Sequence, residues 1–139
     1  MRITLFSLEE ANRLLGEIRP ELDRLHAQKR EFDRLETRID VLLVATAGAG
    51  SENPDALELR SLCEKRRRLG ETIGRGISRL GERGALVKDL DQGLCDFYAL
   101  MGDRLVFLCW RPGEPEIAHW HSLDEGFAGR RPLKNAELE

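Results

Sequence analysis

Long hydrophobic runs and an excess of one charge are both missing from this sequence. No apolar stretch reaches the roughly 18 residues that would indicate a membrane span. The first residues lack the apolar core of a signal peptide, so we expect a cytoplasmic protein with no membrane partner. Lys and Arg number 22 against 25 Asp and Glu, and neither residues 1–84 nor residues 85–139 are strongly basic. Nucleic-acid-binding proteins usually have a basic region, which argues against nucleic acid as the main partner.

Cysteines and catalytic motifs are scarce as well. The three cysteines, Cys63, Cys95 and Cys109, are odd in number and include no Cys-x-x-Cys pair. This pattern favours free thiols in a reducing compartment. The sequence contains no nucleophile elbow, His-Glu-x-x-His motif, dinucleotide-binding glycine pattern or kinase signature. It therefore leaves open whether the protein is an enzyme.

What is present in residues 1–84 predicts a long antiparallel helical hairpin. Ser7-Leu8-Glu9-Glu10 is a capping box, and apolar residues then recur at helical spacing as far as Leu42. Pro20 interrupts this pattern and predicts a kink or a short break near residues 18–19. Residues 48–52 form a linker, and Asn53-Pro54-Asp55 starts a second helix. Two long helices joined by a short loop must lie antiparallel.

Four glycines lie within the second helix, at positions 70, 74, 76 and 81. Each glycine costs a helix interior roughly 1 kcal/mol relative to alanine. We expect close approach of another backbone, from the first helix or from a second subunit, to compensate. The alternative is a break in the helix near residues 74–76.

After Gly84 the pattern changes to the two-residue alternation of strands. Strands are predicted at residues 85–90, 94–100, 104–110 and 116–121. The prediction is an α+β protein with a small antiparallel sheet of three to four strands. We expect residues 1–139 to form a single domain, in which the hairpin (1–84) precedes a β cap and C-terminal segment (85–139).

The last predicted strand ends in His119-Trp120-His121, which suggests a metal site. Residues two apart on a strand share a face, so both imidazoles could reach one divalent transition metal such as zinc. Asp124 is our preferred third ligand, and Glu125, Asp89, Asp91 and Cys109 are further candidates. This set would suit metal-assisted hydrolysis, with Asp124 or Glu125 as ligand or general base. Alternatively, both histidines only make hydrogen bonds with their neighbours.

Two other segments could bind anions. Gly129, Arg130 and Arg131 combine flexible backbone amides with two guanidinium groups. The alternative is that the arginines pair with Asp124 or Glu125 while Phe127 fills the core. The basic run at residues 65–68 points around the whole helix and forms no single stripe. A solvated helix surface is its simpler interpretation, and weak nucleic-acid binding is the other.

Several motifs in the second half of the chain resemble a known family. They are Val87-Lys88-Asp89-Leu90-Asp91, Gly93-Leu94-Cys95-Asp96-Phe97, Leu108-Cys109-Trp110, Gly113-Glu114-Pro115-Glu116-Ile117, Trp120-His121, Gly126-Phe127 and Gly129-Arg130, preceded by Phe6-Ser7-Leu8-Glu9-Glu10-Ala11-Asn12. Together they resemble the bacterial family named domain of unknown function 2203. The resemblance implies a small cytoplasmic bacterial protein with a helical N-terminal half, and it supplies no activity or catalytic residues.

These observations rank three functions. The first is an oligomerising interaction or structural module, in which the apolar faces of two hairpins form a homodimer. The second is a metal-binding protein or metal-dependent hydrolase that uses His119 and His121. The third is weak nucleic-acid binding through the basic run.

Overall fold

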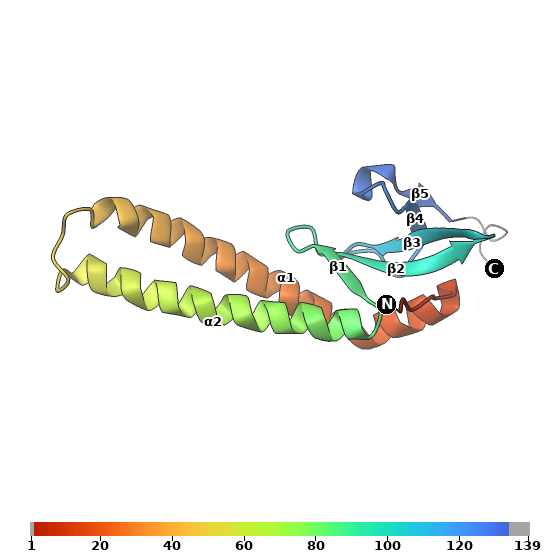
Figure 1. Ribbon diagram of the computed structural model, residues 1–139, viewed down its shortest axis with the longest axis horizontal. Coiled ribbons are helices and arrows are strands. Elements are labelled where there is room, and N and C mark those ends of the chain that lie inside the picture. The colour runs from red at the N-terminus through yellow and green to blue at the C-terminus, as the bar shows by residue number, and fades with distance from the viewer. Residues whose placement is uncertain (1, 134–139) are drawn as a thin grey trace.

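A computed structural model describes residues 2–133 and confirms the α+β prediction. Two long helices form an antiparallel hairpin, and an antiparallel sheet follows them (Figure 1). The elements in order are α1 (Leu8–Ala45), α2 (Pro54–Glu82), β1 (Leu86–Asp89), β2 (Leu94–Met101), β3 (Arg104–Trp110), β4 (His119–Ser122), the 3-10 turn η1 (Phe127–Gly129) and β5 (Arg131–Pro132). Among the described residues, no helix is both long and apolar enough to cross a membrane.

Both helices begin at the caps that the sequence predicts. The Ser7 hydroxyl accepts a hydrogen bond from the Glu10 amide at 3.1 Å, and the Glu10 carboxylate accepts one from the Ser7 amide at 2.9 Å. Asn53 caps α2 through its side-chain oxygen, which accepts from the Asp55 amide at 2.8 Å. These bonds satisfy amides that a helix start otherwise leaves unpaired.

Pro20 lies inside α1 and does not end it. Figure 1 shows the axis of α1 bending in its first half, drawn in red to orange. A proline lacks the amide that would bond to the carbonyl four residues earlier, which accounts for a bend in this region. The predicted kink is therefore seen and the predicted break is not, because the helix continues to Ala45.

The glycines of α2 divide into two groups, and α2 is unbroken. A Cβ on Gly76 would lie 2.8 Å from Leu25 Cδ2, and one on Gly70 would lie 3.4 Å from the Phe32 ring. These two positions let α1 approach closely, as we expected. A Cβ on Gly74 or Gly81 would meet no described residue outside α2 within 4 Å. Packing between the two helices therefore explains half of the glycine content of α2.

The sheet is a five-stranded meander in the order β1-β2-β3-β4-β5. The sheet has one strand more than the three to four predicted. The additional strand, β5, has only two residues, which is too short to show a periodic pattern in the sequence. The fourth strand starts at His119 rather than at residue 116. Its expected first part is held instead by α1, since the Ile117 amide donates to Asn12 Oδ1 at 2.7 Å.

The two faces of the sheet differ in what covers them. The inner face packs on the helices and forms the main core with Phe97, Leu108, Trp110 and Trp120. The first half of α1 and the end of α2 complete this core with Leu15, Ile18 and Leu80. Figure 1 shows η1 on the side of the sheet away from the helices. The distal half of the hairpin extends beyond the sheet, where Leu35, Ile39 and Leu42 are buried.

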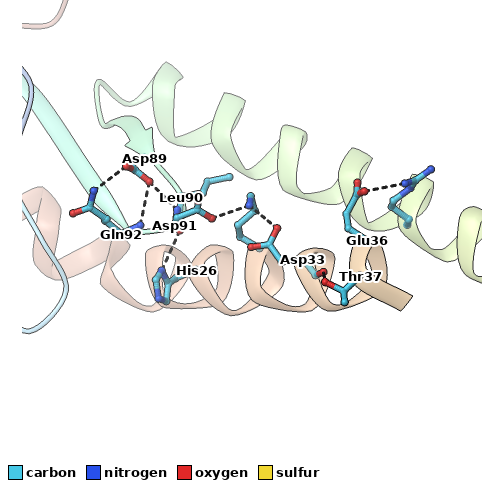
Figure 2. A network of polar contacts seen from close by, with 10 residues as sticks. His26, Asp33, Glu36, Thr37, Asp89, Leu90, Asp91 and Gln92 are labelled. Carbon is cyan, nitrogen blue, oxygen red and sulfur yellow. Dashed lines mark hydrogen bonds and ion pairs between the residues drawn. The ribbon is translucent and has the colours of Figure 1, made fainter. Parts of the chain in front are cut away.

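The turn between β1 and β2 ties the sheet to α1. Figure 2 shows His26 facing this turn, with its Nδ1 3.1 Å from the Leu90 carbonyl oxygen. Lys29 forms ion pairs with Asp91 at 2.8 Å and with Asp33 at 2.7 Å. These contacts set the position of the sheet along the hairpin.

Candidate metal centre

Three ligand types meet on the outer face of the sheet, at Asp96, Cys109 and His121. Asp96 on β2 pairs in register with Cys109 on β3, and Cys109 pairs with His119 on β4. His121 lies two residues further along β4 on the same face. One ligand atom from each of Asp96, Cys109 and His121 lies within 4.8 Å of the others. All three residues are buried, with exposed fractions of 2%, 1% and 4%.

The ring of His121 is oriented by a backbone carbonyl. Its Nδ1 lies 2.9 Å from the Ser122 carbonyl oxygen, and its Nε2 lies 3.0 Å from Asp96 Oδ2. A carbonyl oxygen only accepts, so Nδ1 carries the hydrogen and donates it. Metal-binding histidines commonly donate one ring N–H to a carbonyl while the other nitrogen binds the metal. Here Nε2 is the nitrogen that faces the other two groups.

The Asp96 carboxylate is only partly satisfied. Its Oδ1 atom is buried and has no hydrogen-bond partner among the described residues 2–133. Burial raises the pKa of Asp96, and the opposing effects of His121 and the Cys109 thiol do not cancel this rise. An unpaired buried carboxylate oxygen is costly. A cation at this point would compensate it.

The thiol of Cys109 is also strongly affected by burial. Burial and the neighbouring Asp96 raise the pKa of Cys109 to about 12. The thiol is therefore protonated at neutral pH without a metal. A divalent metal reverses this tendency, because a coordinated thiol is deprotonated outright. Metal binding here would accordingly release a proton.

A cavity of about 110 Å³ adjoins all three side chains. Its wall also includes Lys88, Phe107 and residues of the segment after β4, notably Leu123, Glu125 and Phe127. This segment partly covers the outer face, so the three groups face a small, partly open cavity. One side of a bound metal would therefore face a small cavity.

The structure brings together only part of the predicted metal set. His119 and His121 share a face of β4, as expected, but His119 Nδ1 lies 3.3 Å from Glu114 Oε2 and outside the cluster. Asp124 is exposed in the turn after β4. Cys109, a further candidate in the sequence, belongs to the cluster.

Asp96 was missed by the sequence-based reasoning. Its signal was a single acid within the apolar strand Leu94–Met101. A buried acid in such a strand needs a partner, but the partner depends on strand register. The register of β4, which brings His121 to Asp96, could not be read from the sequence, because β4 starts at His119 rather than at residue 116.

The predicted anion-binding residues make intramolecular contacts. Arg130 binds Glu114 through both carboxylate oxygens at 2.8 and 2.9 Å. Arg131 lies 3.4 Å from Glu125, which is the pairing that our alternative interpretation expected. A Cβ on Gly129 would lie 2.7 Å from the Glu125 side chain, so this glycine allows the chain to pass close to that carboxylate. Both guanidinium groups thus have partners within the chain.

The basic run on α2 is largely neutralised. Lys65 and Arg66 pair with acids of α1, Glu31 at 4.0 Å and Glu36 at 3.1 Å. Arg67 pairs with two acids of α2, Glu64 and Glu71. This agrees with the interpretation as a solvated helix surface.

Comparison with curated proteins and with solved structures gives no match. Residues 4–133 match the family described as uncharacterized conserved protein (DUF2203). The match covers every described helix and strand, including the strands that carry Asp96, Cys109 and His121. The chain therefore belongs to the DUF2203 family.

Proposed function

We propose that this protein binds one divalent transition metal, with zinc as the best match, through Asp96, Cys109 and His121. The observation that carries the proposal is the convergence of three buried ligand atoms within 4.8 Å. The unpartnered Oδ1 of Asp96 adds to it, because this atom needs a positive partner. The orientation of His121 by the Ser122 carbonyl supports the same conclusion.

The ligand types favour zinc over harder metals. A thiolate, an imidazole and a carboxylate together suit zinc, whereas calcium and magnesium prefer oxygen ligands. Binding also balances charge, since one divalent ion neutralises one carboxylate and one thiolate. The site would hold the metal by three protein ligands, which is the number typical of catalytic zinc sites. A metal-dependent hydrolase, the second function ranked from the sequence, is therefore compatible with this proposal.

Elemental analysis of protein purified without a histidine tag tests the proposal. We expect about one zinc ion per chain, as one site requires. His121→Gln and Cys109→Ala should lose the metal. The matched controls are His119→Gln and Cys95→Ala, which change a neighbouring imidazole and a buried thiol of the inner face.

The same experiment separates this ligand set from the one predicted from the sequence. Loss of metal in His119→Gln and Asp124→Asn would favour the His119, His121 and Asp124 set. Protein that is free of metal, and whose melting temperature zinc does not raise, would refute metal binding at either set.

A second candidate function is homodimerisation through the helices. A Cβ on Gly74 or Gly81 of α2 would contact no other element among residues 2–133, so no packing in this part of the chain compensates their cost. A shallow groove beside Gly74 is lined by two acids and two arginines, Glu71, Glu82, Arg75 and Arg79. An antiparallel second copy could match this balance of charge. Val44 and Leu57 near the end of the hairpin are exposed at 80% and 49%, which adds apolar surface.

Light scattering at micromolar concentration tests this second candidate. We expect a dimer that Gly74→Leu together with Gly81→Leu converts to monomer. Ser61→Leu is the control, because it places a leucine side chain about 140° around α2 from Gly74. A monomeric parent protein would refute the dimer.

A further inference from the structure

We infer that the proposed metal keeps one coordination position open for an oxygen of a small carboxylate or phosphate, which enters through the cavity beside Lys88. This inference rests on the proposed metal site and deepens it. The cavity touches Asp96, Cys109 and His121 at once, so the side of the metal that lacks a protein ligand faces the cavity.

The charges around the cavity favour an anion. A divalent metal with the Asp96 carboxylate and the Cys109 thiolate has no net charge. Glu125 lies near Arg131, with 3.4 Å between their charged atoms, and this offsets its charge. Lys88 then adds a positive charge at the cavity wall, where its ammonium lies 4.3 Å from the centre of the Phe107 ring. The excess charge at the open position is therefore positive.

The size of the cavity limits the ligand. About 110 Å³ holds a few water molecules, at about 30 Å³ each. Pockets for larger ligands measure roughly 300–1,000 Å³. A nucleotide is therefore excluded unless the covering segment moves, whereas acetate or inorganic phosphate fits. A metal with an open position can polarise a bound oxygen, so the inference also supplies what hydrolytic chemistry would need here.

In the part of the chain that the structure describes, Glu125 is the one other acidic group in the cavity wall that could close this position. Its Oε1 accepts from the Ser122 amide at 3.4 Å, and its Oε2 lies near Arg131. Its hydrogen bonds with Ser122 lower the pKa of Glu125. Glu125 is not part of the three-residue cluster and already has these two partners, so we expect it not to bind the metal.

Cobalt(II) loaded into the full chain is the experiment, because its visible absorption reports coordination. Acetate and inorganic phosphate are titrated in separate arms, and we expect at least one of them to change the spectrum with saturation. Lys88→Met keeps the aliphatic contact with Phe107 and should weaken anion binding about tenfold, the effect of losing one nearby charge. Arg104→Met, exposed on β3 and outside the cavity wall, is the control and should change little. The arm that responds identifies the oxyanion.

Three outcomes would overturn the inference. A cobalt spectrum that neither anion changes would show that the position is closed, while the proposed metal site would stand. A spectrum changed by Glu125→Gln in the absence of anion would identify Glu125 as the fourth ligand. A chain that binds no cobalt at all would overturn both the metal site and this inference.

Discussion

The two faces of the sheet have opposite chemistry, although their residues alternate along the same strands. Cys95, Trp110 and Trp120 face the helices and belong to the apolar core. Their direct neighbours Asp96, Cys109 and His121 face the other way and form the polar cluster. A shift of one residue in register would exchange the two sets. Strand register therefore determines whether this sequence forms a candidate metal site at all.

The difference between the faces also concerns what each contributes. The inner face contributes buried apolar area, which is the main source of stability. The outer face buries an acid, a thiol and an imidazole, which contribute little to stability without a further partner. A region that costs stability and gathers metal-binding groups is where function is expected.

The largest expected effect on stability comes from comparing substitutions at two neighbouring positions, one on each face of the sheet. Trp110→Ala should lower the free energy of unfolding by about 3–5 kcal/mol, because it removes a fully buried ring. Cys109→Ala in metal-free protein should cost about 1 kcal/mol, a typical value for a single substitution. Urea denaturation in the presence of a chelator measures both. Equal losses would contradict the division of roles between the faces.

An intermediate effect on stability is expected at the ion pair between Glu114 and Arg130, beside the cluster. Burial opposes ionisation of Glu114, but its hydrogen bonds with Arg130 and the Arg111 amide outweigh this, so its pKa is lowered. Glu114→Gln should cost about 1.5–3 kcal/mol at pH 7, the value of a hydrogen bond to a charged group.

The pH dependence of this loss follows from the lowered pKa. The ionised pair stabilises the fold above the unfolded-state pKa of 4.5. This stabilisation is lost as pH falls through the lower pKa of the folded state. The difference between Glu114→Gln and the parent should therefore shrink below about pH 4.5. Exposed Glu116→Gln is the control, and a difference independent of pH would contradict the assignment.

The smallest expected effect on stability concerns glycines of α2, in the helical layer that covers the inner face of the sheet. Gly74→Ala should stabilise the monomer by about 0.5–1 kcal/mol, because its Cβ would meet nothing. Gly76→Ala should not stabilise it, because its Cβ would lie 2.8 Å from the buried side chain of Leu25. Thermal unfolding at low protein concentration measures both. Stabilisation by both substitutions would show that Leu25 yields freely.

Much of the fold could be predicted because its signals are local. The capping box at Ser7, the cap at Asn53 and the helical spacing of leucines each depend on residues within one or two turns. The candidate site was predicted less well, since it joins residues from three strands. His121 and Cys109 were recognised as candidate ligands, whereas Asp96 was not, and His119 and Asp124 lie outside the cluster.

The sequence by itself determined the helical hairpin, the change to strands after Gly84 and the membership of the family. Local hydrogen bonds and periodicity are sufficient for these features. Only the tertiary structure decided that Asp96, Cys109 and His121 meet, because their meeting depends on how β4 pairs with β3. This pairing places His119 beside Cys109 and His121 beside Phe107, and it joins positions that no local sequence pattern relates.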